Sequence, residues 1–277
     1  MKKKLLSVLL SLTLVTALFA GCGDTKANGD AELTPVKVAA STTPHAEILA
    51  QAKDAMAAKG YDLQVTEFAD YVQPNMVVES GEFDANYFQH INYLDSFNDE
   101  QKTHLVNAGS IHYEPFGIYP GTESDLAKIS EGATIAVPND TTNEARALLL
   151  LEENGLITLK EGVGINATVL DIESNPKKLE ILELEAAQIS RMTKEVAFVV
   201  LNGNYALQAG LNVKDNAVAC ETSSSEAIQQ YVNIIAVKEG NENNEAIKTL
   251  VDVLKSDAIV KYINETYDGS VIPFDAE

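Results

Sequence analysis

The chain has 277 residues, with 41 acidic against 20 basic side chains and a formal net charge of −21. This balance argues against a nucleic-acid-binding protein, because nucleic acids are bound by basic surfaces. The chain has two cysteines, Cys22 and Cys220, which are too few for a cysteine-rich zinc site, and we expect no metal and no cofactor.

The N-terminus has the pattern of a secretion signal. Three lysines at positions 2–4 precede an apolar stretch from Leu5 to Ala20, and Cys22 follows shortly after it. We therefore predict that residues 1–21 are a lipoprotein signal peptide and that acyl chains on Cys22 tether the mature chain to a membrane. The alternative is an ordinary signal peptide followed by an incidental cysteine. The small and polar residues 22–35 predict a flexible linker, and no later segment predicts a transmembrane helix.

From residue 36 onward, strand patterns alternate with helix patterns. Such alternation predicts parallel β-α-β units, and a restart near residue 120 indicates two α/β lobes. The predicted strands are 36–41, 63–68, 83–88, 134–137, 169–172, 179–184, 196–201 and 231–237, and the predicted helices are 44–60, 74–81, 141–154 and 244–267.

The segment from Thr134 to Gly155 is predicted to form a strand, a tight turn and a helix, so that free N–H groups at the helix start can face an anion. Thr141 and Glu144 have the spacing of a capping box. Arg146 lies near this helix start, with no acid three or four residues away. Two alternatives are open from these residues. Either Arg146 binds a planar anion such as a carboxylate, or it is solvated or paired with an acid distant in sequence.

Polar or aromatic residues follow four of the predicted strands, at 68–71, 87–90, 139–146 and 202–205. Two of these stretches belong to the first half of the chain and two to the second. Because ligands bind beyond the carboxyl ends of strands in open α/β sheets, we expect a small-molecule site in a cleft between the lobes.

Five motifs stand in order along the chain: V-E-S-G-E-F-D-A-N-Y-F-Q-H-I-N-Y-L, Y-E-P-F-G-I-Y, A-V-P-N-D-T-T-N-E-A-R-A-L-L-L-L, L-E-A-A-Q and V-V-L-N-G-N-Y-A-L. Together they resemble the NlpA-type family of methionine-binding lipoproteins, which are substrate-binding components of ABC importers. The resemblance runs from about Val36 to the C-terminus. It departs from the family at residues 221–230, which lack the Ser-Pro-Tyr run expected before the 231–237 strand.

The resemblance implies an α/β, two-lobed periplasmic-binding-protein fold with a ligand cleft between the lobes. Residues 36–118 would form the first part of lobe 1, residues 119–228 lobe 2, and residues 229–277 the return to lobe 1.

The family's ligand roles carry over to six positions. The resemblance implies that Arg146 takes the ligand α-carboxylate with help from Asn143, and that Asn202 binds the polar head. Tyr71, Phe88 and His90 would line the pocket around the side chain. From the residues themselves, ordinary structural roles are the alternatives: a core position for Phe88, a capping or buried histidine at 90, a surface ring at 71 and a turn at 202.

The resulting hypothesis is a monomeric lipoprotein, anchored on the outside of the cytoplasmic membrane, that captures methionine, with the choice between the L- and D-isomers left open. It would deliver this ligand to an ABC permease whose ATPase subunit is a separate chain. The alternatives are a binding protein for a methionine-containing dipeptide or related amino acid, and a surface interaction protein that has kept the fold. We expect no enzyme, because the chain lacks the H-x-x-x-H, G-x-S-x-G and G-x-x-x-x-G-K-[ST] motifs.

Overall fold

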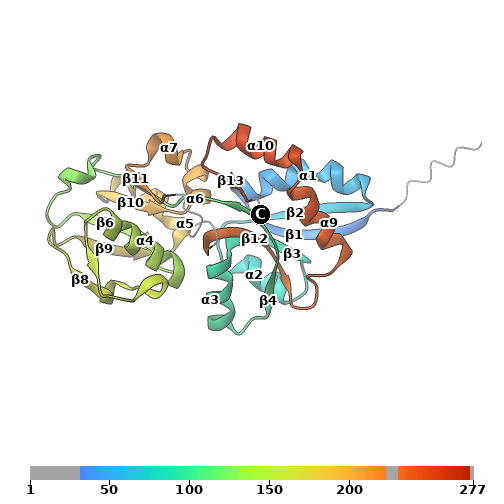
Figure 1. Ribbon diagram of the computed structural model, residues 1–277, viewed down its shortest axis with the longest axis horizontal. Coiled ribbons are helices and arrows are strands. Elements are labelled where there is room, and N and C mark those ends of the chain that lie inside the picture. The colour runs from blue at the N-terminus through green and yellow to red at the C-terminus, as the bar shows by residue number, and fades with distance from the viewer. Residues whose placement is uncertain (1–31, 223–229, 275–277) are drawn as a thin grey trace, which may run out of the picture. The chain divides into compact units, whose positions relative to one another are not determined.

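The computed structural model describes residues 32–222 and 230–274 (Figure 1). The predicted signal peptide, the lipidation site Cys22 and most of the predicted linker therefore lie outside the described residues, as do residues 223–229 of the predicted second lobe. Residues 33–277 form one compact unit. Within the described ranges, no helix has the length and apolar character needed to span a membrane.

The first sheet has six strands among the described residues, in the order β13-β4-β12-β3-β1-β2. Strand β1 pairs in parallel with β2 and β3, as the β-α-β pattern predicts, whereas β12 is antiparallel to β3 and β4. The chain therefore returns to this sheet after building the second one. The strand bounds are β1 Thr34–Ser41, β2 Tyr61–Phe68, β3 Ala85–His90, β4 Leu105–Tyr113, β12 Val232–Lys238 and β13 Ile272–Pro273.

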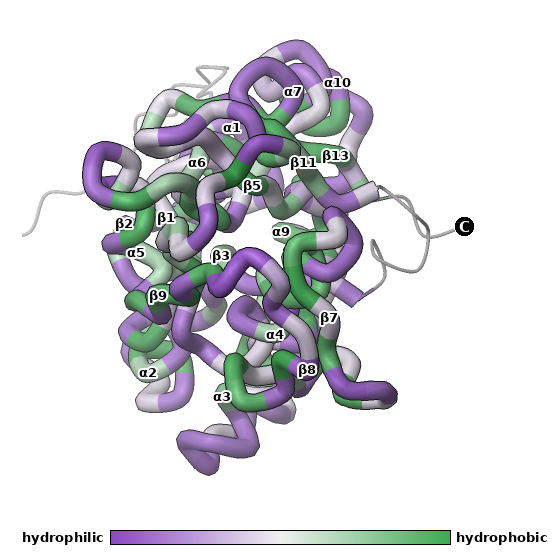
Figure 2. Tube along the Cα trace, turned by 90° about the vertical axis from the view of Figure 1, so that its left-hand side faces the viewer, coloured by the Kyte–Doolittle hydropathy of each residue, from purple (hydrophilic) through white to green (hydrophobic). Residues whose placement is uncertain are grey.

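Amphipathic helices cover the first sheet. Helix α1 buries Ile48, Leu49, Ala52 and Met56, the face that the helical spacing predicts. Hydrophilic and hydrophobic stretches alternate along the traces of α3 and α10 (Figure 2), because each helix buries one face. The bounds are η1 Thr42–Ala46, α1 Glu47–Ala58, α2 Gln73–Glu79, α3 Ile91–Gln101, α9 Glu245–Leu254 and α10 Asp257–Tyr267.

The second sheet has five strands in the described part of the chain, in the order β11-β5-β10-β6-β9. Helix α4 packs its apolar residues onto this sheet, in a separate hydrophobic core. The strand bounds are β5 Gly117–Pro120, β6 Thr134–Pro138, β9 Glu180–Leu184, β10 Phe198–Leu201 and β11 Ala219–Cys220, and a small ladder joins β7 Thr158–Leu159 to β8 Ile172–Ser174. The helix bounds are α4 Thr141–Glu153, α5 Ala186–Ile189, α6 Gly203–Gln208 and α7 Val213–Asn216, with short turns η2 Leu126–Lys128, η3 Gly164–Asn166, η4 Val169–Asp171 and η5 Ser190–Lys194.

The structure differs from several local predictions. The predicted helix at 244–267 is two helices, α9 and α10. The capping box is wrong: Asp140 is the N-cap of α4 and accepts from the Asn143 N–H, whereas the Glu144 carboxylate accepts from the N–H of Val169. The predicted strand at 169–172 is mostly the turn η4, because a capping box between Thr168 and Asp171 closes that turn. The side chains at the start of α4 are therefore held by Asp140.

Candidate ligand-binding site

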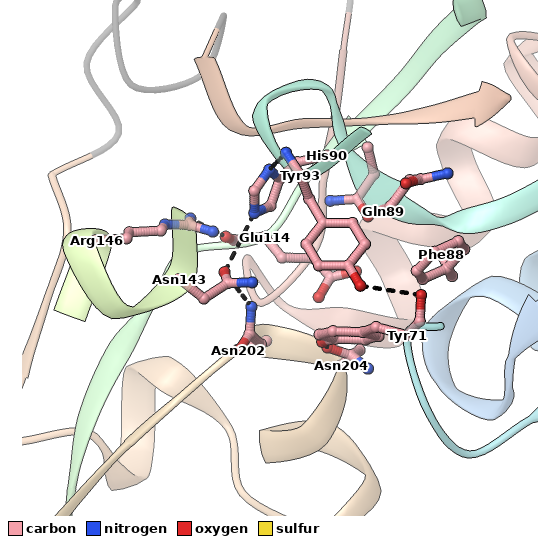
Figure 3. Close-up of a pocket in the computed structure, with 12 residues that line it drawn as sticks. Tyr71, Phe88, Gln89, His90, Tyr93, Glu114, Asn143, Arg146, Asn202 and Asn204 are labelled. Atoms are coloured by element: carbon pink, nitrogen blue, oxygen red, sulfur yellow. Dashed lines mark hydrogen bonds between the residues drawn. The ribbon is translucent and has the colours of Figure 1, made fainter. Parts of the chain in front are cut away.

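All six residues predicted to contact a ligand line one pocket, which encloses about 320 Å³ of atom-free space partly continuous with solvent (Figure 3). The lining comes from strand ends and helix starts of both sheets. It consists of Tyr71, Phe88, Gln89, His90, Tyr93, Glu114, Asn143, Arg146, Asn202, Gly203, Asn204 and Asn233. The pocket thus joins the carboxyl ends of strands from both sheets, where a cleft was predicted.

His90 is both the last residue of β3 and the N-cap of α3. Its Nδ1 accepts a hydrogen bond from the Tyr93 N–H at 3.1 Å, so the ring proton belongs on Nε2. That Nε2 lies 3.2 Å from Oδ1 of Asn143 on the second sheet's helix α4. Burial, assisted by the charge of Arg146, lowers the pKa of His90 to about 3. The capping alternative and the pocket-lining prediction therefore both describe this histidine, which is neutral at pH 7.

Asn143 is the centre of a buried amide network (Figure 3). Its Oδ1 accepts from His90 and from Nδ2 of Asn202, the latter at 2.8 Å, and its own Nδ2 donates to Asp140 at 2.8 Å. Oδ1 of Asn202 is buried and has no hydrogen-bond partner among the described residues. A buried acceptor without a donor costs about 1–3 kcal/mol, so this oxygen favours a ligand that brings an N–H group.

An aromatic wall forms the opposite side of the pocket. The ring of Tyr71 lies 5.6 Å from those of Phe88 and Tyr93 and 5.0 Å from that of Tyr205. Its hydroxyl donates to Oδ1 of Asn204 at 2.6 Å, which fixes the ring across the cleft. Because apolar and thioether groups pack well against ring faces and edges, this wall suits a flexible apolar side chain.

Arg146 is buried, with 4% of its surface exposed, but it is already paired. Its Nε and Nη2 donate to the two carboxylate oxygens of Glu221 at 2.7 and 2.6 Å, and Nη2 also donates to the backbone carbonyl of Glu114 at 3.0 Å. Burial would lower the pKa of Arg146, but the Glu221 carboxylate outweighs it and raises the pKa above its ordinary value. The open alternative of a distant acid partner is therefore the one observed, although Arg146 also lines the pocket.

Glu114 is a pocket residue that sequence reasoning missed. Its Oε1 accepts from Nε2 of His112 at 2.7 Å and lies 3.5 Å from Nε2 of His45. Burial raises the pKa of Glu114, partly offset by His45 and Arg146. A Cβ added at Gly203 would lie 2.7 Å from the Glu114 carboxylate, so only glycine leaves room for this side chain against α6.

The two histidines around Glu114 are neutral. Burial lowers the pKa of His45 to about 4 and that of His112 to about 3, and the Tyr87 hydroxyl is bonded to Nδ1 of His112. His45, His112 and Glu114 are also the one set within the described ranges whose ligating atoms lie within 4.8 Å of one another. Glu114 already accepts from His112, and Nε2 of His45 is hydrogen-bonded to Oδ1 of Asn233 at 2.9 Å, so the arrangement holds Glu114 in place.

The fold and this site define a class: two-lobed substrate-binding proteins with a small-molecule pocket between two α/β sheets. The chain belongs to the NlpA lipoprotein family, whose model matches residues 36–274.

Relatives of known name and structure agree with this membership. The chain is 41% identical over 277 residues to the methionine-binding lipoprotein MetQ of Bacillus subtilis, covering 99% of both chains. A lipoprotein structure from Ruminococcus gnavus is 68% identical, with a TM-score of 0.86 over 87% of this chain and all of that one. A nutrient-binding protein from Burkholderia cenocepacia, solved with methionine bound, is 40% identical with a TM-score of 0.83 and covers 87% of this chain at its full length. These relatives are named as lipoproteins or binding proteins.

Proposed function

We propose that this chain is the substrate-binding lipoprotein of an ABC importer and that it captures free methionine between its two lobes. The observation that carries the proposal is the pocket itself, in which a carboxylate, an arginine and an aromatic wall face one another (Figure 3). An α-amino acid with a thioether side chain has a complementary group for each of them.

The ammonium group of the ligand would be held by acceptors. Glu114 offers a carboxylate, and Oδ1 of Asn202 offers a buried acceptor that has no donor among the described residues. An ammonium group has three donors, so it can satisfy both. This assignment keeps Asn202 as the residue that binds the polar head of the ligand.

The carboxylate of the ligand would be held by donors on helix α4. Glu221 takes Nε and Nη2 of Arg146, which leaves the Nη1 amino group to donate to a ligand. Asn143 can assist, because an amide nitrogen has two hydrogens and Asp140 accepts one of them. The thioether would lie against Tyr71 and Phe88, with His90 at the end of that wall.

The chain would act as a binding protein rather than an enzyme, and it would release its ligand to the permease by opening of the cleft. Lipid on Cys22 would anchor it as a monomer on the outside of the cytoplasmic membrane. L-methionine, D-methionine and a methionine-containing dipeptide share the chemistry of this pocket, so a binding test must include all three.

A thermal-shift screen of the chain from residue 33 tests the proposal, because residues 33–277 form one compact unit. A ligand that binds only the folded state raises the melting temperature by mass action. The protein is unfolded, dialysed and refolded first, so that ligand carried through purification is removed. We expect methionine-like ligands to raise the melting temperature and the other amino acids to leave it unchanged. The proposal would be contradicted if no methionine-like ligand raised it.

A further inference from the structure

The donors around Arg146 form a carboxylate-binding site, and a side chain of the protein itself, that of Glu221, occupies this site. The Glu221 carboxylate receives donors from Arg146 Nε and Nη2, from the Tyr113 hydroxyl at 2.8 Å and from the Phe116 N–H at 3.2 Å. The side chains of Arg146 and Glu221 are 4% and 12% exposed. A bidentate pair with two further donors is held in one geometry by the fold.

Aromatic rings reinforce this geometry. The guanidinium carbon of Arg146 lies 4.0 Å from the ring centroid of Tyr231 and 4.7 Å from that of Phe116. Rings on a guanidinium fix its plane and replace part of its hydration. The plane of Arg146 is therefore set before any ligand arrives, with the edge that carries Nε and Nη2 directed to Glu221.

The charge balance of the pocket follows from this pairing. Arg146 and Glu221 together form a neutral unit, and burial keeps the histidines at 45, 90 and 112 uncharged near neutral pH. The remaining carboxyl group in the lining is that of Glu114. The lining is thus neutral or negative, which favours an ammonium group and gives a ligand carboxylate little net attraction.

We propose that Glu221 is a specificity-determining residue: by neutralising Arg146 within the protein, it allows the site to accept an α-carboxamide in place of the free α-carboxylate. The chemical class so admitted is a primary amine with a methionine side chain whose carboxyl group is an amide. The ligand's carbonyl oxygen then accepts from Nη1 of Arg146 in either case. The inference rests on the proposed function and deepens it.

Calorimetry with L-methionine and L-methioninamide tests this. In the wild-type chain we expect the amide to bind within about tenfold of the free acid, because the charged guanidinium donor is kept and only the acceptor changes, from a carboxylate oxygen to a neutral carbonyl oxygen. Rejection of the amide by more than about a hundredfold overturns the inference. This ratio needs no variant, so it decides the matter even if substitutions at 221 do not fold.

The variant Glu221→Gln provides a second test of the inference. Removing the negative charge leaves Arg146 uncompensated, so the preference for the free acid over the amide should widen by about tenfold or more. Glu153→Gln removes an equal charge from the exposed end of the same helix and should leave the ratio unchanged. An unchanged ratio in Glu221→Gln overturns the inference. Failure of both ligands to bind the wild-type chain is a different result, because it overturns the proposed function itself.

Discussion

His90 and Asn143 meet across the pocket, with Nε2 of the histidine 3.2 Å from Oδ1 of the amide. One residue ends β3 in the first sheet, and the other lies in the first turn of α4 on the second. Their contact joins the two sheets through a hydrogen bond whose direction is fixed, because Nδ1 of His90 is occupied as an acceptor. The pocket therefore depends on a network that spans both lobes.

The variant Asn143→Ala should weaken methionine binding by at least about tenfold and lower the free energy of unfolding by about 1–3 kcal/mol. The reason is that two buried donors, on His90 and Asn202, lose their shared acceptor. Calorimetry and urea unfolding measure the two effects. Asn166→Ala, at an exposed position of the same lobe, is the matched control. Wild-type affinity in Asn143→Ala would refute the network's role.

The variant Arg146→Ala should lose about 3–5 kcal/mol of folding stability, because Glu221 is left largely buried without its cation. It should also weaken methionine binding by about tenfold or more, since the ligand loses a guanidinium donor. The double variant Arg146→Ala/Glu221→Gln separates the two effects. We expect it to regain most of the stability in urea unfolding but not the affinity in calorimetry. Recovery of methionine binding in the double variant would show that Arg146 acts only as a structural partner.

Folding stability should fall as the pH drops from about 6.5 toward 4. Burial lowers the pKa values of His45, His90 and His112 to about 4, 3 and 3, below the ordinary value of 6.5. The unfolded chain takes up protons at these rings below pH 6.5 while the folded chain does not, so stability is full above that pH and lost below it. The expected loss at pH 5 is roughly 2 kcal/mol per ring.

Buried carboxyl groups act in the opposite sense. The raised pKa values of Glu114 and Asp140, both due first to burial, mean that their protonation favours the folded state as the pH falls. Urea unfolding at pH 7.5 and pH 5 measures the balance. His112→Gln should reduce the pH dependence, because it removes one of the three buried rings. Equal stability of the wild-type chain at both pH values would contradict the prediction.

Lipid attachment at Cys22 is tested separately, since this residue lies outside the described part of the chain. Cys22→Ser removes the thiol that would carry the acyl chains, so we expect the protein to move from the membrane pellet to the soluble fraction. Ultracentrifugation of lysed cells followed by immunoblotting measures this. A variant that stays firmly with the membranes would show that the anchor is something else.

Local sequence patterns predicted most of the fold, but they did not predict strand β4 (Leu105–Tyr113). Its sequence L-V-N-A-G-S-I-H-Y carries a glycine and several polar residues, which weaken a strand signal. The structure supplies the reason for Gly109: a Cβ there would lie 2.5 Å from Cγ1 of Val251 on α9. Close packing of a helix from the end of the chain thus overrides local strand propensity.

The residues of the site could be predicted only in part, for a related reason. Residues that follow predicted strands, such as His90 and Asn202, could be placed at a cleft because strand ends converge there. Glu114 could not, since it follows the strand that was missed. The sequence did not predict the partner of Arg146 either. Glu221 lies 75 residues further along the chain, and only the folded sheets bring the two residues together. The spacing of residues along α4 excludes an acidic partner for Arg146 on that helix, but it says nothing of partners elsewhere in the chain.

Calorimetric titration of refolded protein with L-methionine tests the central claim most directly. Unfolding and dialysis remove any ligand carried through purification, and circular dichroism before the titration establishes that the chain has regained its structure. We predict saturable binding of one methionine per chain, abolished or strongly weakened in Asn143→Ala. A correctly refolded protein that gives no binding heat with L-methionine, D-methionine or a methionine-containing dipeptide would contradict the account.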